Sequence, residues 1–243
     1  MSGLFVWTGF DYLGEPTPYP WPARSSYFGI IDLAGFPKDV YYMYQSEWTN
    51  KPVLHILPHW NWQPGKVVDV WAYYNNADEV ELYLNGKSLG IKKKQGDDLH
   101  IAWKVPYQAG TLKAVSRLNG KVVLTKEIKT VGKPAKIELI ADRNLIKADG
   151  NDLSYITARI VDAGGNLVPD ADNLLKFSIA GSAAIVGVDN GQQTSLEPFK
   201  ASQHKAFNGL CLTIVQSKAL AGEITISAEA MGLKPTSIKI KTN

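Results

Sequence analysis

The chain has 243 residues, of which 45% are hydrophobic and 20% are charged, and its formal net charge is +3. A length of this order fits one to three globular domains. No continuous apolar stretch reaches the roughly 18–20 residues of a membrane span, and no clustered basic stripe marks a nucleic-acid footprint. We therefore expect neither a membrane nor a nucleic acid as partner. The single cysteine, Cys211, lies in an apolar run and should be a small buried hydrophobe.

The first part, residues 1–50, opens with the apolar run Leu4–Trp7, which is typical of a buried strand. Four prolines between residues 16 and 22 exclude helix and sheet interior there and predict a loop. Aromatic residues and Met at near-helical spacing predict a helix over Lys38–Trp48. A strand, a loop and a helix do not form a domain alone. Because the start also lacks the layout of a signal peptide, we expect a fragment of a longer protein.

The second part, residues 51–132, is predicted to be a β-sandwich of immunoglobulin-like size. Two Asn-Gly pairs, at Asn85 and Asn119, lie between alternating apolar runs, which is the strongest short-range signal for a hairpin. All seven Trp residues fall before residue 104, so composition also changes along the chain. The expected strands are Val67–Tyr73, Val80–Leu84, Ile101–Val105, Leu112–Leu118 and Val122–Ile128.

The third part, residues 133–243, has seven short strand candidates separated by turn-forming Asp, Asn and Gly, again the pattern of a sandwich. These candidates are Lys136–Ala141, Ser154–Asp162, Leu175–Ile179, Ala184–Val188, Leu210–Gln216, Glu223–Ala230 and Ser237–Lys241. The whole chain is therefore predicted to be all-β, with two immunoglobulin-like sandwiches in tandem behind a strand–loop–helix segment.

Residues Gly3–Pro16 (GLFVWTGFDYLGEP) and Tyr27–Asp39 (YFGIIDLAGFPKD) resemble the end of the catalytic (β/α)8 barrel of bacterial family 2 glycoside hydrolases, the β-galactosidase and β-glucuronidase group. They look like the eighth barrel strand, its loop and the closing segment. The resemblance implies that residues 1–50 are the last part of such a barrel. Its catalytic region would then lie upstream in the same polypeptide.

The rest of the chain resembles two further domains of the same enzymes. Leu54–Trp62 and Val80–Lys87 are similar to the immunoglobulin-like domain that follows the barrel, and Gly187–Gly191 and Ala206–Gly209 to an invasin-like C-terminal domain. The resemblance implies a parent that hydrolyses β-linked oligosaccharides with retention, through a pair of glutamates. Both glutamates would lie upstream of residue 1, so the fragment should have no catalytic residue and be inactive alone.

The resemblance also implies two substrate-binding residues of the parent. Trp7 would form a wall of the sugar subsite, and Asp11 would bond sugar hydroxyls or orient its neighbours. The alternative is that Trp7 is barrel core and Asp11 caps a loop. No cofactor is expected, and a periplasmic or extracellular parent is expected by resemblance.

The aromatic run His59, Trp60 and Trp62 leaves two interpretations open. These side chains pack the sandwich against its neighbour, or they take part in a glycan-stacking platform, in which case the first sandwich is a carbohydrate-binding module. The aromatic residues that could form this platform are Trp60, Trp62, Trp71, Tyr73 and Tyr74. A third hypothesis, an adhesin-like spacer, rests on the last part of the chain alone. His55 and His59 are four residues apart, but Pro58 argues against the helix that a metal pair would need, so no metal site is expected.

Overall fold

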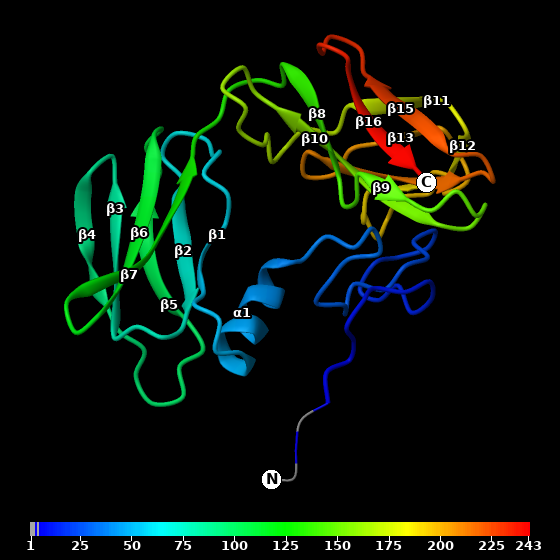
Figure 1. The fold of residues 1–243 in the computed structure, drawn as a ribbon. Helices are drawn as coiled ribbons and strands as arrows, with labels where there is room; N and C mark the ends of the chain where they lie inside the picture. The colour runs from blue at the N-terminus through cyan, green and yellow to red at the C-terminus, as the bar shows by residue number, and fades with distance from the viewer. Residues whose placement is uncertain (1–2, 4) are drawn as a thin grey trace. The chain divides into compact units, whose positions relative to one another are not determined.

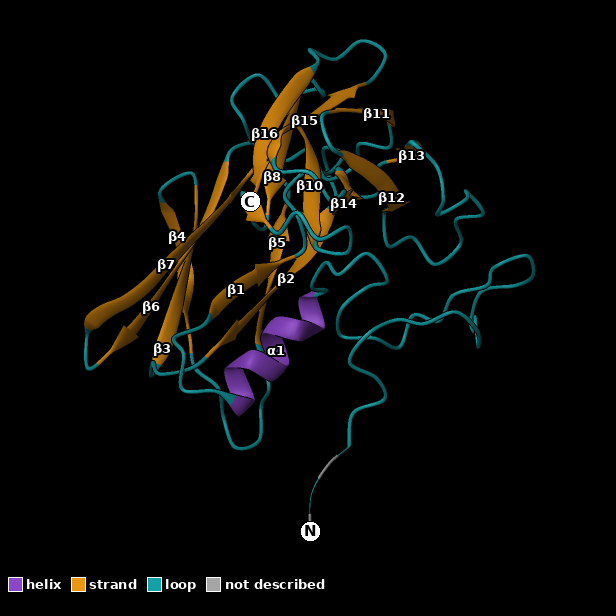
Figure 2. Ribbon diagram, turned by 45° about the vertical axis from the view of Figure 1, so that its right-hand side comes forward, coloured by secondary structure: helices purple, strands orange, loops and turns teal. Residues whose placement is uncertain are grey.

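The computed structural model describes residue 3 and residues 5–243, and within them it is almost entirely β (Figure 1). The described part contains one helix, α1, and sixteen strands, coloured by type in Figure 2. The contacts divide the chain into two compact units. One comprises the residues up to Phe36 together with Gly132–Asn243, and the other comprises Pro37–Val131. Each unit contains one of the two predicted sandwiches.

The first sandwich packs a three-stranded sheet against a four-stranded one, with orders β1-β2-β5 and β4-β3-β6-β7. Its strands are β1 (Leu54–Leu57), β2 (Val67–Tyr74), β3 (Glu79–Leu84), β4 (Lys87–Lys92), β5 (Ile101–Pro106), β6 (Thr111–Leu118) and β7 (Lys121–Lys129). Burial alternates along β3 and β5, so one face of each sheet supplies the core. That core includes Val70, Leu82, Leu112 and the ring of Trp103.

The two predicted hairpin turns are confirmed. Asn85 and Gly86 have φ values of 51° and 82°, and Asn119 and Gly120 have 50° and 75°. Both central residues of each turn are thus in the left-handed region, as a type I′ turn requires.

Helix α1 (Asp39–Trp48) matches the predicted helix within one residue and packs on β1 and β2 of the first sandwich. The ring of Tyr42 stacks on that of His55 with centroids 3.9 Å apart. The Nε2 atom of His55 also lies 2.7 Å from the Asp39 carboxylate. The helix is therefore held to this sheet by a stacked ring pair and a polar contact beside it.

The second sandwich has sheets of order β12-β14-β10-β8 and β13-β11-β15-β16-β9. Its strands are β8 (Lys136–Ala141), β9 (Leu145–Ile146), β10 (Leu153–Val161), β11 (Leu174–Ala180), β12 (Ala183–Asp189), β13 (Gln203–Lys205), β14 (Leu210–Ser217), β15 (Gly222–Glu229) and β16 (Thr236–Thr242). All seven predicted strands are present, and β9 and β13 are additional. Ile156, Val215, Ile224 and Ile240 fill the core. Cys211 is buried, and burial raises the pKa of its thiol.

Residues 7–36, which we call the lead segment, form a doubled-back loop without a regular strand. Backbone bonds join its halves: the amide of Asp11 donates to the carbonyl of Ile31 at 2.9 Å, and that of Gly14 to Arg24 at 2.7 Å. The strand predicted at Leu4–Trp7 is not formed over Phe5–Trp7, while Leu4 lies outside the described residues. A barrel strand needs neighbouring strands to pair its backbone groups, and the described chain supplies none there.

Candidate functional site

The Asp11 carboxylate is buried where the lead segment meets the second sandwich, with 3% of the residue exposed. It accepts a hydrogen bond from the Gly29 amide at 2.8 Å and one from the Gln193 side-chain amide at 3.0 Å. A Cβ atom at Gly29 would lie 2.1 Å from the backbone nitrogen of Asp11, so only glycine fits at position 29 without a shift of the backbone. Asp11 thus joins the two halves of the loop and ties both to the turn after β12.

Asp32 and Asp189 also belong to this contact. A Cβ atom at Gly191 would lie 2.1 Å from an Asp32 carboxylate oxygen, which places that oxygen directly over the 189–191 turn. The Asp32 carboxylate accepts from the Phe36 amide at 2.8 Å, and that of Asp189 accepts from the Asn190 amide at 2.7 Å.

Burial is the main cause of an upward pKa shift for both carboxyl groups. The pKa of Asp32 rises to about 7, with Asp189 and Asp11 adding negative charge nearby. Burial likewise raises the pKa of Asp189. This contact therefore holds acidic groups whose ionisation is resisted by their surroundings.

Arg24 completes the contact from the lead segment. Its guanidinium donates to the carbonyl of Glu197 at 2.9 Å and lies 5.0 Å from the ring centroid of Phe199. We call the set Asp11, Arg24 and Asp32, with their partners in residues 189–199, the seam. It joins parts of the chain more than 150 residues apart through hydrogen bonds and one cation–ring contact.

The lead segment also carries exposed aromatic and apolar side chains. Trp7 is 73% exposed and Trp21 is 90% exposed, and Phe10 and Leu13 are also open to solvent. The Trp7 indole nitrogen donates to the Tyr12 hydroxyl at 3.1 Å, and that hydroxyl bonds Glu15. The lead segment therefore combines polar side chains that are buried in the seam with large apolar side chains that remain uncovered.

The aromatic run after β1 divides into core and surface. Trp60 is 1% exposed, and its indole nitrogen donates to the carbonyl of Gln108 at 2.9 Å. It is a core residue, so its predicted part in a glycan-stacking platform is wrong: no face of its ring is open to a sugar. Trp62 is half-buried and stacks on His59 with centroids 4.7 Å apart, beneath the Lys66 ammonium.

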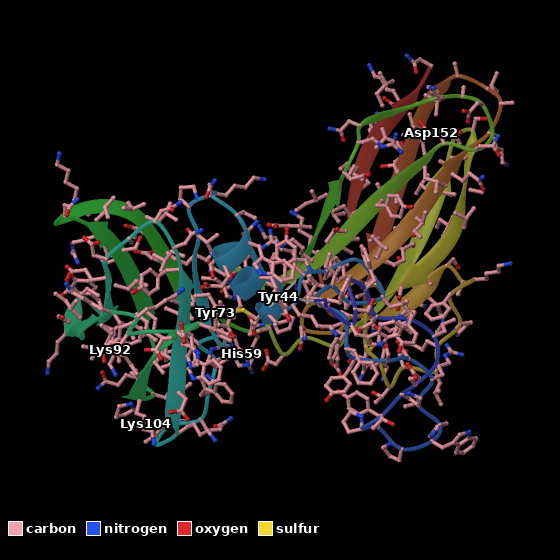
Figure 3. All side chains as sticks on the ribbon, turned by 90° about the horizontal axis from the view of Figure 1, so that it is seen from below. Tyr44, His59, Tyr73, Lys92, Lys104 and Asp152 are labelled. Carbon is pink, nitrogen blue, oxygen red and sulfur yellow. The ribbon has the colours of Figure 1, made fainter. Side chains whose placement is uncertain are left out.

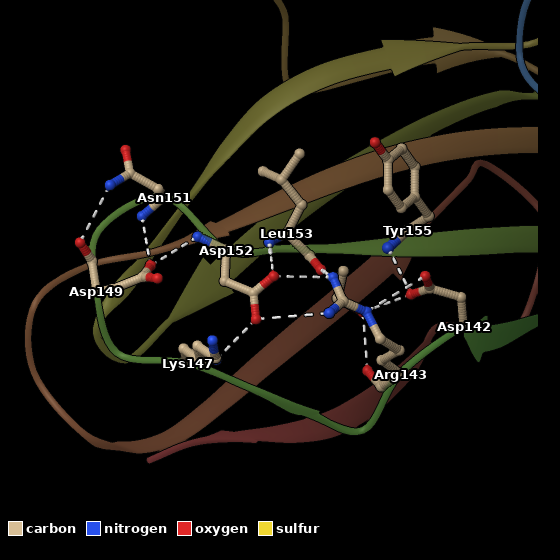
Figure 4. Close-up of polar contacts among 9 residues, drawn as sticks. Asp142, Arg143, Lys147, Asp149, Asn151, Asp152, Leu153 and Tyr155 are labelled. Atoms are coloured by element: carbon tan, nitrogen blue, oxygen red, sulfur yellow. Dashed lines mark hydrogen bonds and ion pairs between the residues drawn. The ribbon is translucent and has the colours of Figure 1, made fainter.

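The acidic loop around β9 shows how carboxylates in this chain are satisfied internally (Figure 4). Arg143 donates to Asp152 at 3.0 Å, and Asp152 also accepts from the Lys147 amide at 2.8 Å. Asp149 accepts from the amide of Asn151 at 2.8 Å.

In the part of the chain that the structure describes, no cluster of three or more His, Cys, Asp or Glu residues could hold a metal ion. No helix of these residues is long and apolar enough to cross a membrane.

Comparison with known families gives two matches. Residues 137–239 match the model of glycoside hydrolase family 2 C-terminal domain 5. Residues 65–124 match a domain of unknown function, DUF4982. Each match thus falls on one of the two sandwiches.

Curated and solved relatives extend this likeness over the chain. It is 58% identical over 240 residues to a β-galactosidase of Bacteroides ovatus, covering 99% of this chain and 28% of that protein. A putative β-glucuronidase of Formosa agariphila is 42% identical over 202 residues, or 78% of this chain and 19% of that protein. The crystal structure of a β-glycosidase from Bacteroides vulgatus superposes with a TM-score of 0.90 at 36% identity, covering 96% of this chain and 30% of that one.

A family 2 glycosyl hydrolase of Bacteroides cellulosilyticus gives the same TM-score and identity over 98% of this chain and 35% of its own. The chain therefore spans only about a third or less of the length of each of these four relatives.

Proposed function

Because this chain belongs to glycoside hydrolase family 2 and corresponds to the C-terminal part of its members, we propose that it is the bracing region of a β-galactosidase-like enzyme. In this proposal the lead segment is the closing end of the catalytic barrel. The seam anchors that end to the second sandwich, and hydrolysis depends on glutamates upstream in the same polypeptide.

The observation that carries the proposal is the contrast within the lead segment. Its polar side chain Asp11 is buried beside Gln193, whereas Trp7, Phe10 and Trp21 remain open. Several large apolar side chains exposed within one short segment are typical of a surface that another part of the protein covers. An upstream barrel would cover part of this surface and leave the rest beside the substrate.

Within this proposal Trp7 and Asp11 have different parts. Trp7 would form an aromatic wall of the sugar subsite, since its ring is open and is oriented by Tyr12. Asp11 would position the loop, because its oxygens already accept from Gly29 and Gln193 inside the seam. The substrate would be a β-linked oligosaccharide, by analogy with the relatives named above.

The test compares this chain with the full-length enzyme. The purified chain should not hydrolyse an aryl β-galactoside. In the full-length enzyme, Gln193→Ala should remove the hydrogen bond that the Gln193 side chain donates to Asp11, which costs about 1–3 kcal/mol locally, and should lower kcat/KM. Asn151→Ala, in the exposed loop after β9, is the control and should leave kcat/KM unchanged. Turnover by the chain that scales with its concentration and survives repurification contradicts the proposal, as does unchanged catalysis in the Gln193 variant.

A further inference from the structure

The outer face of the sheet β1-β2-β5 carries a row of rings that crosses the strands. His55 and Tyr73 are direct cross-strand partners. The ring of His100, immediately before β5, lies 6.3 Å from that of Tyr73. Helix α1 packs at the His55 end of this row, where Tyr42 stacks on His55. At the other end the ring of Trp71 stacks on His100, with centroids 4.1 Å apart and planes 21° apart.

Trp71 is the open member of this group, with 37% of the residue exposed. Its cross-strand partner on β5 is Ala102, a small residue that leaves the indole standing above the sheet surface. A flat ring that is supported by a second ring, and flanked by a small side chain, presents a rigid shelf at little entropic cost.

A polar hollow of about 530 Å³ adjoins this shelf, between the end of β4 and the start of β5. His100 and Ala102 line it on the shelf side, and Lys92, Gln95 and Asp98 line the other. Specific small-molecule sites combine aromatic and apolar walls with a few polar groups that fix orientation, typically within about 300–1,000 Å³. The shelf and the hollow together have that composition.

The charges at the rim indicate what the hollow prefers. Three lysines follow one another, and two of them have carboxylate partners: Lys93 with Glu79, at 3.2 Å, and Lys94 with Glu47. The Lys92 ammonium instead lies over the ring of Trp103, at 5.8 Å, and among the described residues no carboxylate lies within ion-pair distance of it. The Asp98 carboxylate accepts a hydrogen bond from the backbone amide of Gln95, at 3.0 Å. This bond closes the turn in the connection between β4 and β5, at the edge of the hollow.

We propose that this edge of the first sandwich binds an oligosaccharide that carries a uronic acid. One pyranose ring lies against the Trp71–His100 shelf through its apolar C–H face, and the uronate carboxylate pairs with Lys92. Gln95 and Asp98 bond sugar hydroxyls. The site involves no residue of the lead segment or the seam, so it stands independently of the bracing role. Figure 3 labels Lys92 together with Tyr73 and Lys104 of this sandwich.

The experiment titrates the 243-residue chain with a tetrasaccharide containing galacturonic acid and with its neutral, galactose-containing counterpart, followed by calorimetry. We expect saturable binding of the acidic tetrasaccharide. Trp71→Ala should weaken it at least about tenfold, as truncation of a central aromatic contact does. Trp48→Ala is the matched control, because Trp48 is also an exposed Trp of this unit but lies on α1. It should leave the affinity unchanged.

A second pair of variants tests the charge. Lys92→Gln should reduce affinity for the acidic tetrasaccharide severalfold, whereas Lys104→Gln, at an exposed position of β5 outside the hollow, should not. Both side chains are exposed, so neither change threatens folding. Equal binding of the neutral and acidic ligands overturns the assignment of an acidic sugar. No binding of either ligand, or binding that survives Trp71→Ala, overturns the site itself.

Discussion

Replacing Asp32 by Asn should remove part of the pH dependence of the seam. Burial raises the pKa of Asp32 from 3.8 to about 7, so the folded seam binds a proton more tightly than the unfolded chain does. Stability from this group is therefore complete below pH 4 and is lost as pH rises through 7. At about 1.4 kcal/mol per pKa unit, the full loss is on the order of 4 kcal/mol, and partial solvent access reduces it to roughly 2–3 kcal/mol.

Asn keeps an oxygen that can accept from the Phe36 amide and carries no charge at any pH. The Asp32→Asn seam should match the original below about pH 4 and become progressively more stable than it as the pH rises, with the full difference present at pH 8. Burial raises the pKa of Asp189 as well. The free energy of opening of the variant should therefore still fall with pH, but with a smaller slope. The assay is amide hydrogen exchange of residues 10–36 at pH 5, 6, 7 and 8, converted to free energies of opening. Asp97→Asn, in an exposed loop of the first sandwich, controls for net charge.

An original chain whose free energy of opening does not change between pH 5 and pH 8 would refute this reasoning. An Asp32→Asn variant with the same slope as the original would refute it as well, because the slope would then belong to other groups.

Two further changes test the packing. Gly29→Ala places a Cβ atom 2.1 Å from the Asp11 backbone nitrogen and should open the lead segment, at a cost on the order of 3 kcal/mol. Limited proteolysis will measure this opening. The Gly9→Ala variant should be cleaved no faster than the original chain, because a Cβ atom at Gly9 would meet no other atom within 4 Å. Trp60→Phe should destabilise the first sandwich by about 2 kcal/mol in urea, whereas Trp62→Phe should cost less than about 1 kcal/mol. Equal losses would contradict the core assignment of Trp60.

The hairpins and most strands were predictable because their signals are local. Asn-Gly specifies two left-handed residues at once, and alternation over six or more residues marks a half-buried strand, as β3 and β5 show. Strands β9 and β13 have two and three residues and lie at sheet edges, so they are too short to show a period. The division into parts at residues 50 and 132 stays a prediction.

The site was predictable only in part. The resemblance singled out Asp11 and Trp7. It could not identify Gln193 as a partner of Asp11, because Gln193 lies 182 positions away along the chain. The sequence around Gln193 predicts only a turn. Trp60 and Trp62 are indistinguishable by type and differ only in what the fold places around them. The Trp71 ring is supported by the stacked ring of His100. His100 lies outside the predicted strands, so the sequence pattern gave no sign of this contact.

The seam also connects the second sandwich to Trp7 through the backbone. Asp11 holds Gly29 across the doubled-back loop, and next to it the Ile31 amide donates to the Gly9 carbonyl at 3.0 Å and the Ile30 amide to Thr8 at 3.1 Å. This ladder ends one residue from Trp7. We therefore expect Gln193, a residue of the sandwich, to influence the orientation of Trp7, the proposed sugar wall, without touching the substrate. It would do so by fixing the position of the hydrogen-bonded residues that follow Trp7 in this loop.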